Sequence, residues 1–253
     1  MGDVHVLGMH GMGDCIHARA IIRQLLQRYA RVWLETPWPC LYHDLVESGK
    51  LILINKRSRL RTQAKNAERE RAAFSKRRPP FGAAQVRIWY PPALVRERGS
   101  VLGAMLHATK LDESHYDFSL PLPDAWQIRA AELIEALAPT KPILIYRPLV
   151  ERTEWNGCAA RNPDAAAYRH LLEVIRDQFY VISVADLEPG VEWLTGDEMP
   201  ADVQFHRGEL DIEILAALTQ RAALTFASPG FLVPLSQALA VPSVCVFGGY
   251  ENG

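Results

Sequence analysis

Cysteine is scarce in this 253-residue sequence, and none of its four cysteines belongs to a C-x-x-C pair. The four residues, Cys15, Cys40, Cys158 and Cys245, are far apart along the chain and offer neither a zinc-binding pattern nor a disulfide framework. Free thiols are typical of proteins that work in a reducing cytosol. The cysteine pattern therefore favours a cytoplasmic protein.

Long apolar runs are also missing. No stretch approaches the roughly 18 apolar residues that a membrane span needs. Residues 1–7 lack the basic and apolar regions of a signal peptide. We therefore expect a soluble, cytoplasmic protein, for which contact with the surface of the inner membrane stays an open alternative.

No charge of one sign dominates. The net charge is −1, and 49% hydrophobic with 23% charged residues is an ordinary globular balance. Such a balance argues against a surface built as a whole for nucleic acid, so any region that binds anions must be local.

Several catalytic and metal-binding motifs are absent from the sequence. No H-x-x-x-H pair lies on one predicted helix and no D-x-D element follows a predicted strand, so a metal-dependent enzyme is not supported. The motifs G-x-S-x-G and G-x-x-x-x-G-K-[ST] are missing too, which leaves hydrolase and P-loop hypotheses without their signatures. We expect neither a metal nor a cofactor.

Short apolar runs alternate with helical periodicity along most of the chain, a pattern that predicts an α/β fold with parallel strands. The predicted strands are 4–7, 32–34, 51–54, 86–90, 143–146, 180–184, 203–205, 223–226 and 243–247. The predicted helices are 14–29, 125–137, 164–177, 211–220 and 231–239, with Asn162 as N-cap and Pro163 as first residue of the third. Punctuation at 138–142 divides the chain into two predicted Rossmann-like domains, 1–138 and 139–253.

A glycine-rich turn follows the first predicted strand and opens the first helix. In Gly11-Met12-Gly13-Asp14, backbone N–H groups at a helix start favour an anion or another ligand. Asp14 suits a general base that takes a proton from an acceptor hydroxyl, and the alternative is that it only caps the helix.

A dinucleotide site is a second hypothesis for this turn. Glu35 ends the second predicted strand, about where an acid that binds ribose would lie. The fingerprint is incomplete, because Ile16 stands where it requires glycine or alanine. An NAD(P)-dependent oxidoreductase therefore remains an alternative.

The turn and the helix after it resemble the amino-terminal signature of the heptosyltransferase-like family, glycosyltransferase family 9. The resemblance covers residues 11–14 and the run Ala18-Arg19-Ala20-Ile21-Ile22-Arg23-Gln24-Leu25. It implies a GT-B fold, in which two Rossmann-like domains with parallel sheets enclose an interdomain cleft. It also implies that Asp14 is the catalytic base and that residues 1–138 form the acceptor-side domain.

The second half is similar to the same family in the order of its segments. Residues 206–218, 223–230 and 240–248 follow the family's helix, its strand with a "D-S-G" turn, and its closing "P-x-V-x-L-F-G" strand. The resemblance implies that residues 139–253 bind a nucleotide sugar. It places Ser228 and Gly230 at a helix start that can hold a donor phosphate, and the alternative is an ordinary turn with Ser228 as N-cap.

Three arginines and a glutamate complete the predicted donor site. Arg147, Arg152 and Arg161 lie between a predicted strand and a helix, where cations can neutralise a diphosphate, although solvation of a loop is the alternative. The family often binds donor ribose or base through a glutamate in the region of Glu188, and Glu192 could take that role instead.

The sequence also departs from the family. Ser228, Pro229 and Val233 replace the aspartate, serine and histidine of "D-S-G-x-x-H", and the chain stops at Gly253, just after the last predicted strand. The donor half is therefore expected to be incomplete, divergent or inactive. A catalytically inactive homologue that binds a nucleotide or a glycan is a further alternative.

A basic segment interrupts the α/β rhythm. Residues 56–78 contain ten lysines and arginines, opposed only by Glu68 and Glu70. The segment predicts contact with an anionic glycan or glycolipid acceptor or with the membrane surface, and a solvated loop or helix is the alternative. Aromatic residues are sparse within it, so we expect no nucleic-acid partner.

Together these patterns predict a glycosyltransferase. It would transfer a sugar from a nucleotide-diphosphate sugar to an acceptor hydroxyl without a metal. The family resemblance implies inversion at the anomeric carbon and a place in lipopolysaccharide biosynthesis.

Overall fold

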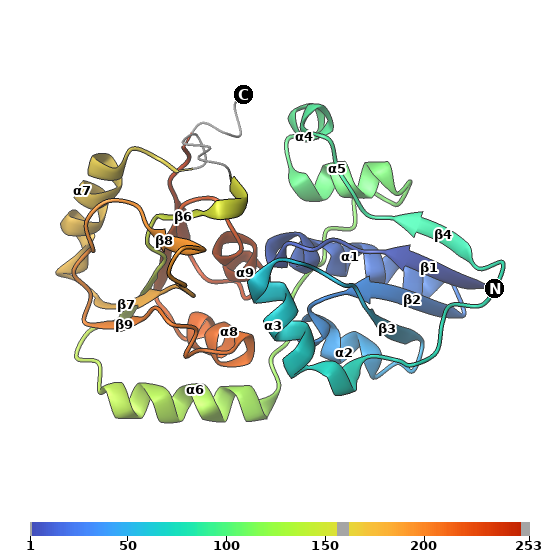
Figure 1. Ribbon diagram of the computed structural model, residues 1–253, viewed down its shortest axis with the longest axis horizontal. Coiled ribbons are helices and arrows are strands. Elements are labelled where there is room, and N and C mark those ends of the chain that lie inside the picture. Colours follow the sequence, from blue (N-terminus) through green and yellow to red (C-terminus); the bar gives the residue numbers. More distant parts are fainter. Residues whose placement is uncertain (1, 156–161, 249–253) are drawn as a thin grey trace. The chain divides into compact units, whose positions relative to one another are not determined.

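The computed structural model describes residues 2–155 and 162–248, and its internal contacts divide the chain into two units, Met1–Leu120 and Pro121–Gly253 (Figure 1). Each unit contains its own parallel sheet, so the predicted α/β class with two parallel sheets is confirmed. None of the helices in the described ranges is both long and apolar enough to cross a membrane.

The first unit is built on four parallel strands in the order β3-β2-β1-β4. The strands are β1 (Asp3–Leu7), β2 (Arg31–Thr36), β3 (Leu51–Asn55) and β4 (Ala84–Arg87). The helices are α1 (Met12–Arg28), η1 (Pro39–Tyr42), α2 (His43–Val46), α3 (Arg61–Arg69), η2 (Arg71–Ala73), α4 (Pro92–Arg98) and α5 (Val101–Ala108).

Apolar residues on the sheet and on α1 form the core of this unit. Val4 and Val6 alternate with less buried neighbours in β1, and both are fully buried. On α1, Ile16, Ile21 and Leu25 recur at helical spacing and are buried as well. The periodicity in the sequence thus reports the side of α1 that packs inward.

Arg19 is a charged residue within this core. Its side chain is fully buried and forms a fork with Asp44, at 2.9 and 2.8 Å. Its Nε also donates to the main-chain oxygen of Ser119 at 2.9 Å, and Nη1 donates to the main-chain oxygen of Leu41. A buried guanidinium needs such partners, and these bonds tie α1 to two distant segments of the same unit.

The second unit contains a five-stranded parallel sheet in the order β11-β10-β5-β7-β9 and a small antiparallel pair, β6-β8. The strands are β5 (Ile143–Tyr146), β6 (Val150–Arg152), β7 (Tyr180–Val184), β8 (Glu192–Leu194), β9 (Val203–Phe205), β10 (Leu224–Ala227) and β11 (Ser243–Cys245). The helices are α6 (Asp124–Leu137), η3 (Thr153–Trp155), α7 (Ala165–Arg176), α8 (Ile212–Gln220) and α9 (Leu232–Ala238).

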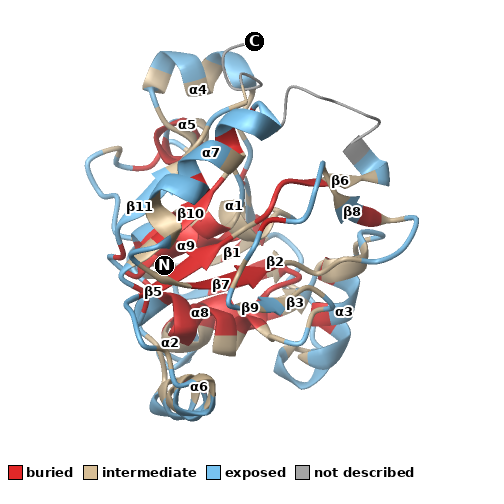
Figure 2. Cartoon of the chain, turned by 90° about the vertical axis from the view of Figure 1, so that its left-hand side faces the viewer, coloured by how far each residue is buried: buried red, intermediate tan, exposed pale blue. Residues whose placement is uncertain are grey.

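The central strand of this sheet is covered on both faces. All four residues of β5 are buried, as expected for a parallel strand between helices. On one face Leu144 and Tyr146 pack with Tyr168 and Leu172 of α7. Figure 2 shows buried residues along these strands, whereas the residues of α6 other than Ala130 are intermediate or exposed.

Helix α6 belongs to the second unit, so the contacts divide the chain after Leu120 and not after residue 138. The physical reason is that α6 packs along α8, where Arg129 Nη2 lies 2.6 Å from Asp211 Oδ2. Proline and threonine at 138–142 mark the end of a helix and not the border between two folding units.

Two predicted details of chain geometry are wrong. Asp164, and not Asn162, is the N-cap of α7, because its carboxylate accepts a hydrogen bond from the Ala167 amide at 2.8 Å. The Asn162 amide instead donates to the main-chain oxygen of Val150 at 3.0 Å. Strand β4 spans Ala84–Arg87 and so starts two residues earlier than predicted and ends before residues 88–90.

Candidate functional site

The first unit has a change of strand order at β1. Its neighbour β2 follows through α1, whereas β4 joins from the other side, with Leu7 of β1 opposite Arg87. In open α/β sheets ligands bind outside the carboxyl ends of the strands at such a switch point. Two segments leave the sheet there, the glycine turn after β1 and the chain after β4.

Asp14 and Tyr90 meet at this switch point. Asp14 is the third residue of α1 and is half-buried, and the N-cap of that helix is Gly11. The hydroxyl of Tyr90, three residues beyond β4, donates to Asp14 Oδ1 at 2.9 Å. The carboxylate is thus held by a residue 76 positions away in sequence, and no motif in the sequence points to that residue.

Gly11 lacks a side chain at the point where Oδ2 of Asp14 lies close to the backbone. A Cβ atom at this position would lie 2.7 Å from Asp14 Oδ2, closer than real contacts of this kind. The backbone of Gly11 has φ −63° and ψ 137°, which other residues also adopt. The glycine therefore leaves space for Oδ2 in its present position, and its backbone conformation is not the reason for a glycine here.

Two opposing effects act on the acidity of Asp14. Burial raises the pKa of its carboxyl, and the hydrogen bond from Tyr90 lowers it, with a net rise above the ordinary value of 3.8. A carboxylate of raised pKa is a better proton acceptor than an exposed aspartate. This arrangement suits a general base.

Glu35 has partners within its own unit. Its Oε1 lies 3.0 Å from His5 Nε2, and its Oε2 lies 3.9 Å from Lys56 Nζ. Ile16, at the position where a dinucleotide fingerprint needs a small residue, is fully buried. These observations do not favour the oxidoreductase alternative.

The second unit has a switch point as well, between β5 and β10. The chain leaving β5 leads to Arg147, and the chain leaving β10 leads to Ser228 and Gly230. The guanidinium of Arg147 lies 4.7 Å from the centroid of the Phe231 ring. A Cβ atom at Gly230 would lie 3.3 Å from Arg147 Nη1, so the glycine leaves space beside the guanidinium.

Glu192 lies between two of the predicted arginines. Its side chain is 4% exposed and accepts a hydrogen bond from Arg152 Nη2 to Oε1 at 3.0 Å, and Arg152 Nε forms an ion-pair contact with Oε2 at 2.9 Å. Arg147 Nη2 lies 3.9 Å from the same carboxylate. Arg152 Nη1 also lies 3.7 Å from Glu154 Oε1, so the two guanidinium groups face two carboxylates. Each guanidinium carries five N–H donors, and those not used by the carboxylates can bind an anion.

The remaining residues of the predicted donor site differ in where the structure places them. Glu188 is exposed on a turn and forms an isolated bridge with Glu192, so Glu192 is the acid placed beside the arginines. Ser228 is half-buried and is not the N-cap of α9, which is Phe231. Arg161 lies outside the described residues.

A cavity of about 260 Å³ adjoins the carboxyl ends of β5 and β7. Its apolar wall includes Tyr146, Tyr168 and Met199, and its polar wall includes Ser183 and His206. Ser183 Oγ and His206 Nε2 are 2.8 Å apart, and burial lowers the pKa of His206. The only signal for this cavity in the sequence was the position of His206 directly after a predicted strand.

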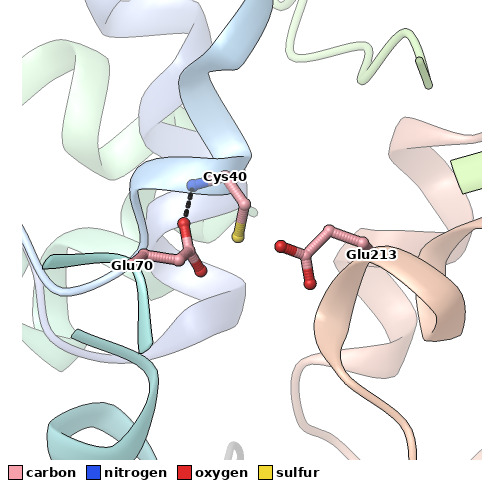
Figure 3. Close-up of side chains that lie close together, drawn as sticks. All are labelled: Cys40, Glu70 and Glu213. Carbon is pink, nitrogen blue, oxygen red and sulfur yellow. Dashed lines mark hydrogen bonds between the residues drawn. The ribbon is translucent and has the colours of Figure 1, made fainter. Parts of the chain in front are cut away.

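The basic segment lies at the end of β3 in the first unit. It lines a depression of about 540 Å³ whose walls include Arg57, Ser58 and Arg59. Part of its charge is neutralised locally, since Arg69 donates to Glu70 at 2.9 Å. The other oxygen of Glu70 accepts from the main-chain amide of Cys40 at 2.7 Å (Figure 3). Arg57 and Arg59 share the lining of this depression with one acid, Glu68.

The sequence matches no protein-family model and no curated protein. Among solved structures, a family 9 glycosyl transferase from Veillonella parvula is similar with a TM-score of 0.59 and 14% identity, over 96% of this chain and 79% of its own. The E. coli ADP-heptose lps heptosyltransferase II is similar with a TM-score of 0.55 and 12% identity, over 98% and 85%.

A third similar structure is the iron-containing dodecameric glycosyltransferase TibC from enterotoxigenic E. coli, with a TM-score of 0.55 and 12% identity. The match covers 96% of this chain but 57% of TibC, so the chain spans little more than half of that protein. The predicted resemblance is confirmed at the level of the fold: this chain has the GT-B fold of the family 9 glycosyltransferases.

Proposed function

We propose that this protein is a glycosyltransferase that moves a sugar from a nucleotide-diphosphate sugar to an acceptor hydroxyl. The observation that carries the proposal is the half-buried Asp14 carboxylate, with its raised pKa, at the switch point of the first sheet. A family 9 fold with a base in this position supports the proposal. The heptosyltransferase II named above makes an ADP-heptose donor the first one to test.

Asp14 acts on the acceptor in this proposal. Its Oδ2 takes the proton of the acceptor hydroxyl, and the acceptor oxygen forms a bond to the anomeric carbon. The bond between that carbon and the diphosphate breaks, and the nucleoside diphosphate leaves with the electron pair. A single displacement of this kind inverts the anomeric configuration.

The second unit binds the donor. Arg147 and Arg152 offset the charge that develops on the leaving diphosphate, so that this chain's own guanidinium groups supply the positive charge. Gly230 leaves the space in which a phosphate oxygen can approach Arg147. The buried Glu192 keeps both arginines in place.

The acceptor in this proposal is an anionic glycan or glycolipid, of the kind used in lipopolysaccharide biosynthesis. The depression lined by Arg57 and Arg59 belongs to the same unit as Asp14, and it offers positive charge for a phosphate or carboxylate of the acceptor. The same segment could bring the protein to an anionic membrane surface.

The test is donor turnover measured by release of the nucleoside diphosphate, with ADP-heptose and other nucleotide sugars as donors. We expect Asp14→Asn to lower turnover by about 100-fold or more while donor affinity is kept, since a general base contributes about that much. Glu47→Gln, which removes an exposed carboxylate of the same unit, is the matched control.

Two results would contradict the proposal. Unchanged turnover in Asp14→Asn would remove Asp14 from the mechanism. Donor binding without turnover in the unaltered protein would instead favour a nucleotide-binding homologue without catalysis, which the replacements at Ser228, Pro229 and Val233 permit.

A further inference from the structure

We propose that Tyr90 is a positioning residue that fixes the Asp14 carboxylate so that Oδ2 faces the acceptor hydroxyl. The inference rests on the proposed function of Asp14. Its structural basis is the 2.9 Å hydrogen bond from the Tyr90 hydroxyl to Asp14 Oδ1, together with the position of Oδ2 over Gly11. One oxygen of the base is thus held by a hydrogen bond, and a side chain at position 11 would crowd the other oxygen.

The backbone around Tyr90 is constrained on both sides. Before it, the Ile88 amide donates to the main-chain oxygen of Leu7 at 3.0 Å, and the Ile88 side chain is 2% exposed. After it come Pro91 and Pro92, the N-cap and first residue of α4. A residue before proline is restricted to extended conformations, so the path that carries the Tyr90 ring is stiff.

This stiffness is what a positioning residue requires. A carboxylate at the end of a side chain rotates freely unless another group holds it, and misplacement by about 1 Å can cost a large factor in rate. The hydroxyl of Tyr90 supplies that restraint from the segment that follows β4, whereas Asp14 follows β1. The two residues become neighbours because β4 pairs directly with β1.

The same bond affects the protonation of the base. Donation to the charged carboxylate favours ionisation and opposes the effect of burial on the Asp14 pKa. The neighbouring thiol of Cys15 is buried, its pKa is raised to about 12, and it stays neutral near pH 7. Titration of that thiol therefore cannot mimic a change at Asp14.

Tyr90→Phe tests the proposal, because it removes the hydroxyl and keeps the ring. Tyr116→Phe is the matched control, since the Tyr116 side chain belongs to the same unit and is 46% exposed. Two measurements apply to each protein: the pH profile of kcat with the donor on which the unaltered protein turns over, and a ¹³C carboxyl NMR titration. Asp14→Asn identifies the Asp14 signal.

We expect Tyr90→Phe to raise the Asp14 pKa and the acidic limb of the kcat profile by about one pH unit. We also expect kcat at the plateau to fall about tenfold, with the donor KM unchanged. Tyr116→Phe should behave as the unaltered protein does. A merely structural role of Tyr90 would change stability without moving either titration.

The outcomes separate the two proposals. If Tyr90→Phe leaves both the carboxyl titration and the kcat profile unchanged, the positioning role is overturned. If the titration moves as expected but the unaltered protein transfers no sugar, the contact between Tyr90 and Asp14 holds while the proposed function fails.

Discussion

The guanidinium of Arg147 lies over the ring of Phe231, with 4.7 Å between the guanidinium carbon and the ring centroid. Arg147 follows β5 and Phe231 directly precedes α9, so the contact joins the two strand ends of the second switch point. A cation held over an aromatic ring keeps its edge available for an anion. This pair is the basis of the first prediction.

Replacement of Phe231 by leucine should weaken donor binding. Leucine keeps an apolar side chain but removes the π face that holds Arg147, and contacts of this kind are worth about 0.5–2 kcal/mol. We expect the dissociation constant of ADP, measured by isothermal titration, to rise about 2- to 30-fold. Phe81→Leu, at a fully exposed site of the first unit, should leave the constant unchanged; an unaltered constant in Phe231→Leu would separate the ring from donor binding.

Gly11→Ala should impair catalysis while the fold is kept. The backbone of Gly11 suits alanine, but the added methyl group would press on Asp14 Oδ2 and displace the carboxylate. We expect turnover to fall about 10- to 100-fold, since misplacement of a reacting group by about 1 Å has an effect of this size.

The control for Gly11→Ala is Gly2→Ala, where an added Cβ meets no atom within 4 Å. Circular dichroism and the melting temperature should be similar for the two variants. Full turnover in Gly11→Ala would show that the space beside Oδ2 does not matter for the reaction.

Asp14→Asn should make the protein more stable near neutral pH. The Asp14 pKa is raised in the folded state above its ordinary value of 3.8, so the folded protein disfavours the ionised form. This penalty is absent below pH 3.8 and appears as pH rises through the folded-state pKa. We expect a gain of about 1 kcal/mol at pH 7 that shrinks on acidification, measured by urea unfolding across pH.

Glu47→Gln is the comparison for this pH series, because it removes an exposed carboxylate and should show no such trend. A gain from Asp14→Asn that persists undiminished at pH 3 would assign the effect to packing and not to charge.

Glu192→Gln should destabilise the second unit. The change leaves the Arg147 and Arg152 guanidinium groups without the carboxylate they share, and breaking a buried pair costs about 3–5 kcal/mol. Because Arg152 is 25% exposed and water can partly replace its partner, we expect a loss of about 2 kcal/mol in denaturant unfolding.

Glu188→Gln offers the matched comparison, because it makes the same chemical change at an exposed acid four positions away. Its effect on stability should stay within about 0.5 kcal/mol. Equal losses in the two variants would contradict a special role for burial at Glu192.

The sequence indicated most of the secondary structure, because the sheet-forming runs are strongly apolar and the helices have clear periodicity. Val4, Val6 and the four residues of β5 are buried as their pattern predicts. The ends of elements were harder to place. Asn162 and Asp164 both suit an N-cap, and the two contacts that decide between them are seen only in the structure: Asp164 accepts from the Ala167 amide, while Asn162 donates to the main-chain oxygen of Val150.

The candidate site could be predicted only in part. Asp14 was visible because its glycine turn is local in sequence. Tyr90 could not be predicted, since its contact with Asp14 depends on the pairing of β4 with β1. The order of strands in a sheet cannot be derived from apolar runs in the sequence. Glu192 was one of two candidate acids in the sequence. Its burial beside the arginines depends on the pairing of β6 with β8, and no periodic pattern in the sequence predicts these two short strands.

The buried Arg19 lies five residues beyond Asp14 on α1, and its bonds to Leu41, Asp44 and Ser119 link this helix to two other segments of the unit. A helix free to rotate by a few degrees would swing its first turn away from the end of β4. Substitutions in the segments that bind Arg19 should therefore shift the position of the Asp14 carboxylate, although they lie far from it. A screen for variants of higher activity can therefore include the segments around Leu41, Asp44 and Ser119 as well as the proposed sugar-binding site.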